Sequence, residues 1–315
     1  MQELKENFSL NTPVLFLVFN RLETTRRVFN SIKKAQPPRI YIASDGPREN
    51  VNGENEIVET VRGYILENID WDCEVKTLFR EKNLGCKYAV SNAISWFFKN
   101  EEQGIILEDD CLPADSFFQF CEELLNKYKN EESIYLISGD SRGPDSILMQ
   151  EDYCLCKYPL IWGWASWANV WNKYDPEISD WPNNRKYLSN LVSKHNSSRK
   201  FWVDTWDKIY QNQIDTWDYQ LTYLLLKNNG KCIVPRLNQV SNIGFGDNAT
   251  HTFDKNSQSA DRETFNFTFP LSHNIKSQNE LLINEFFDKE HFFKPSLIMR
   301  AMNKIKFLIK YFLNK

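Results

Sequence analysis

Short apolar runs alternate with helical patterns along the first part of the chain. The segment PVLFLVFN (13–20) is almost continuously apolar, which is typical of a strand buried on both faces of a sheet. In the segment that follows, Leu22, Val28 and Ile32 recur at helical spacing. This alternation predicts parallel β-α-β units.

The same pattern repeats as far as residue 140. We expect further strands at 39–47, 73–85, 104–110 and 133–140, and helices near 53–68, at 87–98 and from Asp115 onward. The chain is therefore predicted to have an α/β fold with a mostly parallel central sheet flanked by helices. A sheet of this kind binds ligands outside the carboxyl ends of its strands. Polar side chains gather at four such ends, namely Asn20, Arg21, Ser44, Asp45, Arg80, Glu108, Asp109 and Asp110.

The chain beyond residue 140 has a different character. Eight of the ten tryptophans lie between Trp162 and Trp217, and the alternation of strand and helix fades there. Most large aromatic side chains serve packing, so Trp162, Trp164 and Trp167 of the run IWGWASW can each belong to a core or can stack on an acceptor. We expect at least one of them to contact a ligand.

Composition and charge narrow the classes of protein to consider. With 42% hydrophobic and 25% charged residues, the chain has an ordinary globular composition. Its net charge of −4 argues against a dedicated nucleic-acid-binding protein. The seven cysteines are odd in number and form no CxxC pair, so neither a disulfide framework nor a zinc site is expected. The first residues lack an apolar secretory segment, and we expect a cytoplasmic location.

The C-terminal segment has a charge pattern of its own. From Lys294 to Lys315 it carries six basic residues and no acidic one. On a helical wheel its apolar side chains share one face, but the run is too interrupted to cross a bilayer, which needs ~20 apolar residues. Such a helix can pack on the protein's own surface. We expect instead that residues 294–315 contact an anionic membrane surface.

The run GIILEDDCLP (104–113) ends a buried strand on three consecutive carboxylates, Glu108, Asp109 and Asp110. Adjacent carboxylates repel one another, and burial of an unpaired carboxylate is costly. Water, a helix N-terminus or an arginine elsewhere in the chain could compensate them, and so could a divalent cation, which prefers oxygen ligands. The chain lacks both the GxGxxG fingerprint and the P-loop motif, which disfavours a Rossmann dinucleotide site and a P-loop.

Six segments, in their order along the chain, resemble those of the GT-A fold glycosyltransferases related to N-acetylglucosaminyltransferase I and of bacterial sugar transferases with the same layout. They are PVLFLVFNR, SDGP, LGCKYAVSNAISWFF, GIILEDDCLPADSFFQF, LIWGWASW and TWDYQ, and the resemblance covers residues 13–250. It implies a nucleotide-sugar-binding half at 1–140 and an acceptor-binding and catalytic half of the same domain at 141–290. The charge pattern described above adds a basic amphipathic helix at 291–315.

The activity that this resemblance implies is a metal-dependent glycosyl transfer with inversion at the anomeric carbon. The donor would be a UDP-sugar, with N-acetylglucosamine as one candidate sugar, and the cation would be Mn²⁺ or Mg²⁺. The acceptor would be a hydroxyl of a surface glycan or of its lipid-linked precursor, at the inner face of the cell membrane.

The resemblance also assigns residues to the donor site. Asp110, the last acid of the EDD run, would ligate the metal, while Asp109 and Glu108 would face the nucleotide and the sugar. Arg21 would meet the nucleotide, and Asp45 would meet the edge of the uracil.

Five further residues complete the predicted donor site. Asn20 and Arg80 join it from the strand ends described above. Gly163 and Trp164 would let the backbone approach the donor sugar, while an aromatic face of this segment stacks on the acceptor. By the same resemblance, His251 would reach the metal from a glycine-rich loop, although a lone histidine can also be structural.

An inverting transfer needs one further carboxylate, because the acceptor hydroxyl must lose its proton as it attacks. The candidates are Asp204, Asp207, Asp215 and Asp218. We favour Asp218, which stands at the family's catalytic-base position where a helix begins, over the alternative that it only caps this helix. The family usually has a second acid beside this position, where this chain has Tyr219.

Two other functions deserve comparison with glycosyl transfer. A sugar nucleotidyltransferase of similar architecture would carry a glycine-rich turn with a basic residue after the first strand, and this chain lacks that turn. A non-catalytic glycan-binding protein could keep the tryptophan-rich half. The intact EDD run and Asp218 favour an enzyme over such a protein.

Overall fold

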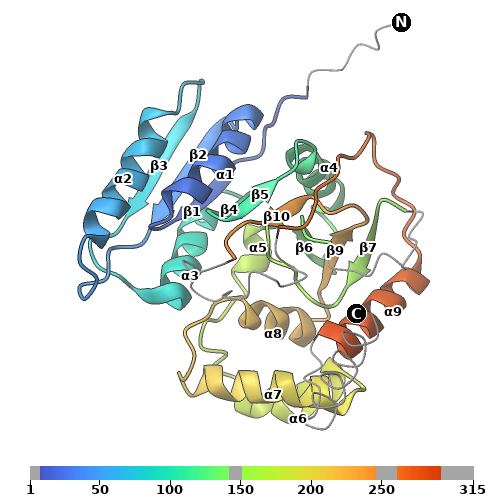
Figure 1. Cartoon of the computed structure of the whole chain (residues 1–315). Coiled ribbons are helices and arrows are strands. Elements are labelled where there is room, and N and C mark those ends of the chain that lie inside the picture. The colour runs from blue at the N-terminus through green and yellow to red at the C-terminus, as the bar shows by residue number, and fades with distance from the viewer. Residues whose placement is uncertain (1–7, 142–150, 246–260, 292–315) are drawn as a thin grey trace, which may run out of the picture.

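The computed structural model describes residues 8–141, 151–245 and 261–291 (Figure 1). Its strands are β1 (Val14–Val18), β2 (Arg39–Ser44), β3 (Glu74–Phe79), β4 (Gln103–Glu108), β5 (Cys111–Pro113), β6 (Ile134–Ser138), β7 (Tyr153–Cys156), β8 (Trp164–Trp167), β9 (Lys231–Pro235) and β10 (Val240–Asn242). Its helices are α1 (Leu22–Ala35), α2 (Glu54–Glu67), α3 (Gly85–Phe98), α4 (Phe117–Tyr128), α5 (Ala168–Trp171), α6 (Trp181–Val192), α7 (Asn196–Tyr210), α8 (Tyr219–Lys227), α9 (Ser277–Phe286) and a π-helical turn η1 (Phe287–His291).

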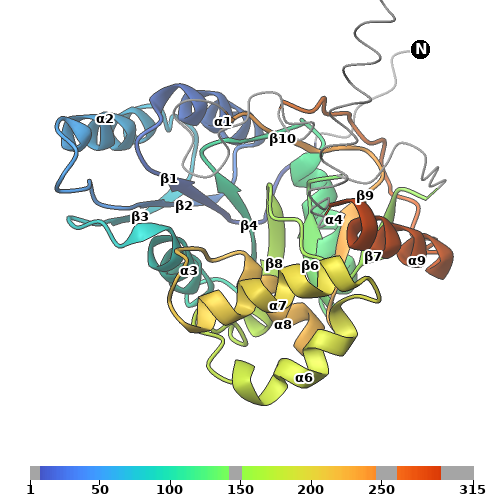
Figure 2. The same ribbon diagram turned by 60° about the horizontal axis from the view of Figure 1, so that its bottom comes forward.

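Eight strands form one sheet in the order β3-β2-β1-β4-β8-β6-β9-β7, and β5 pairs with β10 in a separate two-stranded sheet. Within the large sheet, β7 and β8 run against the other strands. Helices α1 and α2 cover one face of β1 to β3, and α3 covers the other (Figure 2). The predicted α/β fold with a mostly parallel central sheet is thereby confirmed. Because β8 pairs with both β4 and β6, one sheet runs through both parts of the chain.

The register of the parallel strands brings their carboxyl ends to one edge. Val18 lies opposite Ser44, and Ser44 lies opposite Phe79. On the other side of β1, Leu17 lies opposite Glu108. The residues that follow these positions therefore leave the sheet at the same level, which is where a sheet of this type binds its ligand.

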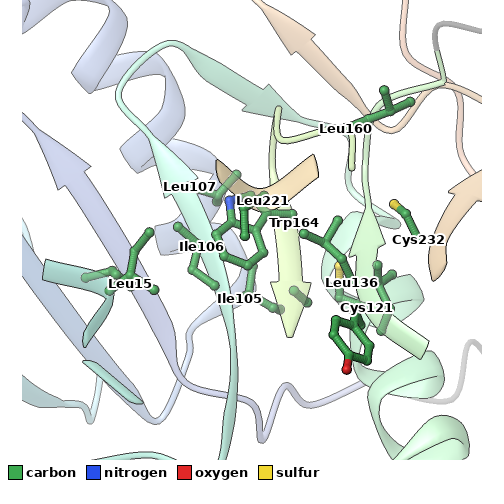
Figure 3. Packing of buried hydrophobic residues seen from close by; sticks show 14 of the residues in the cluster. Leu15, Ile105, Ile106, Leu107, Cys121, Leu136, Leu160, Trp164, Leu221 and Cys232 are labelled. Carbon is green, nitrogen blue, oxygen red and sulfur yellow. The ribbon is translucent and has the colours of Figure 1, made fainter. Parts of the chain in front are cut away.

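The tryptophan-rich part extends the hydrophobic core below the sheet, where α6, α7 and α8 gather (Figure 1). Among its eight tryptophans Trp162 is half-buried and the other seven are buried, so the core interpretation is confirmed for Trp164 and Trp167. Trp206 of α7 packs on Trp181 of α6 at a centroid distance of 5.3 Å and on Tyr223 of α8 at 5.7 Å. Trp164 lies beside Ile106, its partner in β4 (Figure 3). Aromatic burial thus joins the three helices and the sheet.

Some predicted elements differ in the structure, and one lies outside the described residues. The helix expected from Asp115 begins at Phe117, and the Asp115 carboxylate pairs with Lys34 of α1 at 2.5 Å instead of capping a helix. Beyond residue 230, where we place no strand or helix from the sequence before residue 291, the structure contains β9, β10 and α9. Residues 292–315, and with them most of the predicted C-terminal helix, lie outside the described residues. None of the described helices is long and apolar enough to cross a membrane.

Gly163, which precedes β8, offers a test of this packing. It is held at φ +61°, and a Cβ there would lie 2.6 Å from Cγ2 of Val240 and 3.1 Å from Cδ2 of Leu107. We expect Gly163→Ala to lower the free energy of unfolding by about 2–4 kcal/mol, through backbone strain and overpacking. Gly63→Ala on α2 is the matched control and should cost nothing, because a Cβ there meets nothing within 4 Å. Urea denaturation would measure both variants, and equal stabilities would contradict the packing argument.

Candidate functional site

A cavity of about 950 Å³ lies at the carboxyl edge of the sheet. Its volume falls in the range of small-molecule sites. The ends of β1 to β4 line one part of it, and residues 213–219, which lead into α8, line another. Eight residues predicted from the sequence meet there, namely Asn20, Arg21, Asp45, Arg80, Glu108, Asp109, Asp110 and Asp218.

Two of the three carboxylates at the end of β4 bind the same arginine. Nη2 of Arg21 donates to Oδ1 of Asp109 at 2.5 Å, and its Nη1 donates to Oδ2 of Asp110 at 2.8 Å. The second oxygen of Asp109 accepts the backbone amide of Phe19 at 3.3 Å. Glu108 lines the cavity without a hydrogen-bond or ion-pair partner among the described residues. An arginine from elsewhere in the chain, one of the compensating groups considered from the sequence, is thus found at Asp109 and Asp110.

Charge in this cluster stays unbalanced, because one guanidinium faces three carboxylates. Burial, together with the negative charges of Asp110 and Asp109, raises the pKa of Glu108 to about 8. Burial also raises the pKa of Asp109 to about 6, although Arg21 opposes the shift. Burial tends to lower the pKa of Arg21, but the two adjacent carboxylates more than offset it and the pKa is raised. The cluster therefore favours the approach of a further cation.

The segment after β4 shows how Asp110 is held in place. β5 follows the carboxylates directly and pairs with β10, and the amide of Ile243 donates to the carbonyl of Asp110 at 2.8 Å. The chain then passes so close that a Cβ at Gly244 would lie 2.2 Å from Oδ2 of Asp110 and 2.7 Å from Nη1 of Arg21. Glycine is required at this position, and its backbone covers the ion pair.

Asp45 and Arg80 stand at the ends of β2 and β3. The amide of Leu84 donates to both carboxylate oxygens of Asp45, at 3.1 and 3.0 Å, while burial raises the pKa of Asp45. Arg62 of α2 joins the two strand ends, since its Nη2 donates to the carbonyl of Asp45 at 3.0 Å and to that of Arg80 at 2.7 Å. The sequence carries no signal for Arg62, because an arginine within a helical pattern is ordinarily exposed.

Glu54, the first residue of α2, is a second anchor that has no sequence signal. It is 1% exposed, and its carboxylate accepts the side-chain amide of Asn20 at 2.8 Å and the backbone amide of Arg48 at 2.6 Å. The guanidinium of Arg48 also donates to it at 3.0 Å and helps to lower the pKa of Glu54. Glu54 thereby fixes Asn20 and Arg48, both of which line the cavity.

The four candidate catalytic carboxylates fall in two places. Asp215 and Asp218 line the cavity, whereas Asp204 and Asp207 belong to α7 and do not. Asp215 is engaged as a cap, because it accepts two successive backbone amides at the start of α3 at 2.9 and 2.7 Å. Asp218 makes no side-chain cap bond to α8, and its carboxylate accepts the hydroxyl of Thr216. Asp218 thus occupies the N-cap position of α8 without a side-chain capping bond, and its role as the base stays a prediction.

Gly163 and Trp164, predicted at the donor sugar, do not line the cavity. Trp164 is 1% exposed and stacks on Trp217 at a centroid distance of 6.0 Å, because β8 is a central strand with both faces covered. The residues of this segment that line the cavity are Ile161 and Trp162, which precede β8. The ring of Trp162 meets that of Phe245 edge-on at 5.8 Å.

The metal expected at Asp110 can be weighed against the donor atoms present. Among the described residues, no group of three or more His, Cys, Asp or Glu side chains could hold a metal ion. His251, the second predicted ligand, lies outside those residues. Side chains of the described part thus make no complete metal centre by themselves. The unbalanced carboxylates do fit a divalent cation that takes its remaining ligands from a bound diphosphate.

Comparison with known proteins yields partial likenesses. No protein-family model and no curated protein matches the chain. A mannosyltransferase from Pyrobaculum calidifontis, in complex with GDP-Man and Mn²⁺, is 11% identical over 71% of this chain and 70% of that chain, with a TM-score of 0.40. Mouse xyloside xylosyltransferase 1 is 12% identical over 71% and 85%, with a TM-score of 0.37. An apo UDP-glucose pyrophosphorylase is 11% identical over 73% and 93%, with a TM-score of 0.35.

None of these three proteins is an N-acetylglucosaminyltransferase, so the likenesses do not single out that family. With TM-scores of 0.40 or less and identities of 11–12%, these likenesses do not assign an activity to this chain. The functional argument therefore depends on the residues of the cavity.

The raised pKa of Glu108 makes stability depend on pH. Between its usual value of 4.5 and about 8 the folded protein keeps the proton that the unfolded chain has lost, so stability falls as the pH rises through this window. We expect Glu108→Gln to remove most of this loss and to be more stable than the wild type at about pH 8, by about 1–3 kcal/mol.

Denaturation at about pH 5 and about pH 8, without added metal, measures this effect. Glu102→Gln, at an exposed position just before β4, is the matched control and should keep the wild-type pH profile. An unchanged profile in Glu108→Gln would show that Glu108 is not the group responsible.

Proposed function

We propose that this chain is an inverting glycosyltransferase that moves a sugar from a nucleotide diphosphate sugar to an acceptor hydroxyl. The observation that carries the proposal is a single cavity that gathers the polar ends of four parallel strands and a separate carboxylate, Asp218, from the second part of the chain. Transfer between two substrates needs both features, because the donor must be held by its diphosphate while a base takes the proton of the acceptor.

The donor would lie along the edge of the sheet, with its base near Asp45 and its phosphates near Arg21, Arg48 and Arg80. Guanidinium groups suit phosphates, because they offer parallel N–H donors together with a positive charge. Asp110 would hold Mn²⁺ or Mg²⁺ against the diphosphate, and such a cation neutralises charge on the leaving group. The resemblance of the motifs favours a UDP-sugar, with N-acetylglucosamine as one candidate.

The acceptor would enter beside Asp218. Its hydroxyl would attack the anomeric carbon while Asp218 takes the proton, and the bond from that carbon to the diphosphate would break on the opposite side. Trp162 would offer an aromatic face at this end of the cavity. We further propose a surface glycan or its lipid-linked precursor as the acceptor, which would place the reaction at the cytoplasmic face of the membrane.

Product analysis with a panel of UDP-sugars and GDP-sugars, Mn²⁺ and glycan acceptors tests the proposal. Glycosyl transfer releases a nucleoside diphosphate. A nucleotidyltransferase would instead release pyrophosphate from a nucleoside triphosphate and a sugar phosphate, and a glycan-binding protein would bind without turnover. Either of the last two outcomes would replace the proposed function.

The Asp218→Asn variant tests the base. We expect turnover to fall by at least about 100-fold, because a general base contributes about 10²–10⁴-fold, while the dissociation constant for the nucleotide diphosphate stays unchanged. Asparagine keeps the size of the side chain and can still accept the Thr216 hydroxyl. Asp204→Asn, at an exposed position on α7, is the matched control and should turn over at the wild-type rate. Wild-type turnover by Asp218→Asn would exclude Asp218 as the base.

A further inference from the structure

Arg21 occupies the position in which a cation at Asp110 would be expected. We propose that Arg21 is the internal counter-ion of the acidic cluster, and that a divalent cation bound to a diphosphate displaces it toward the phosphates. This inference rests on the donor site proposed above. It makes Arg21 the residue that couples the two ligands, so that cation and diphosphate bind together and each binds weakly alone.

The contacts of the carboxylates leave little room for a second positive charge. Arg21 bridges Oδ1 of Asp109 and Oδ2 of Asp110 at 2.5 and 2.8 Å. The other oxygen of Asp109 accepts the amide of Phe19, and the other oxygen of Asp110 lies 3.5 Å from the thiol of Cys111. A cation beside Oδ2 of Asp110 would have to share that oxygen with a guanidinium, and two positive charges at this separation repel strongly.

The surroundings give Arg21 one direction in which to move. The backbone at Gly244 covers the ion pair, since a Cβ there would lie 2.7 Å from Nη1 of Arg21. The Arg21 side chain is 22% exposed and lines the cavity, so its open side faces the space proposed for the phosphates. A guanidinium that moves there exchanges two carboxylates for a diphosphate, to which it can also donate two parallel hydrogen bonds.

Charge pairing then links the two ligands. A cation alone would take the two carboxylate partners of Arg21 and supply no diphosphate in their place. A diphosphate alone would draw Arg21 away and leave Asp109 and Asp110 buried without a counter-charge, which is costly. With both ligands present the cation compensates Asp109 and Asp110, and the diphosphate compensates Arg21. Because such coupling is reciprocal, each ligand should tighten the binding of the other by the same factor.

Calorimetric titration of the full chain with Mn²⁺, with and without inorganic pyrophosphate, tests this coupling once complex formation in solution is subtracted. In the wild type we expect pyrophosphate to tighten Mn²⁺ binding by on the order of 10–100-fold. In Arg21→Gln we expect Mn²⁺ alone to bind at least about tenfold more tightly than in the wild type, with only a few-fold gain from pyrophosphate. Mn²⁺ alone should also raise the Tm of Arg21→Gln more than that of the wild type.

Two further variants separate the role of Arg21 from net charge. Arg27→Gln makes the same change of charge at an exposed position of α1 and should bind both ligands like the wild type. Arg21→Lys keeps the positive charge and should keep Mn²⁺ binding weak in the absence of pyrophosphate.

Additive binding of Mn²⁺ and pyrophosphate in the wild type would overturn the proposal, and this result does not depend on whether Arg21→Gln folds. Mn²⁺ binding in Arg21→Gln that is no tighter than in the wild type would overturn it as well. The titrations use neither a sugar donor nor an acceptor. Intact coupling in a protein that transfers no sugar would therefore refute the proposed function while the role of Arg21 stands.

Discussion

Three carboxylates at the end of a buried central strand, only partly compensated by a single arginine, form the constraint around which the site is built. β4 lies between β1 and β8, so its end cannot turn outward to solvent without breaking the sheet. Arg21 can reach Asp109 and Asp110 because it directly precedes α1, only a short turn after β1. The β5–β10 pair then brings Gly244 over the contact. The strand order, the short turn after β1 and Gly244 together determine the contacts of this charge cluster.

Buried charged residues also fix the part of the cavity near α2. Glu54 and Arg62 are buried charged residues of α2, and each fixes groups that come from other elements. Removing one partner from such a pair leaves a charge without compensation, which costs far more than a surface ion pair contributes. The side chains that line the cavity are therefore positioned before any ligand arrives, as a binding or catalytic site requires.

The strands and their edge could be predicted because doubly buried parallel strands leave continuous apolar runs, and because their ends must meet. The acidic cluster could be predicted as part of a ligand site because it directly follows one of these apolar runs. Tertiary partners could not be predicted in this way. Nothing in the local pattern distinguishes Glu54 or Arg62 from exposed helical residues, or shows that Trp162 faces the cavity while Trp164 faces the core. Those facts depend on which elements pack together, and for α9 even the apolar signal is weak, since Ile283 is its one buried residue.

The tryptophan-rich part has a role beyond filling space. The loop that carries Asp218 is tied to the sheet by Trp217, whose ring stacks on Trp164 and whose carbonyl accepts the hydroxyl of Tyr174 at 2.8 Å. It is tied to α3 by Asp215, whose carboxylate caps that helix. Two parts of the chain thus hold Asp218 at a fixed place relative to the carboxyl edge of the sheet. A reaction between two bound substrates depends on such fixed geometry, because small displacements of the reacting groups lower the rate steeply.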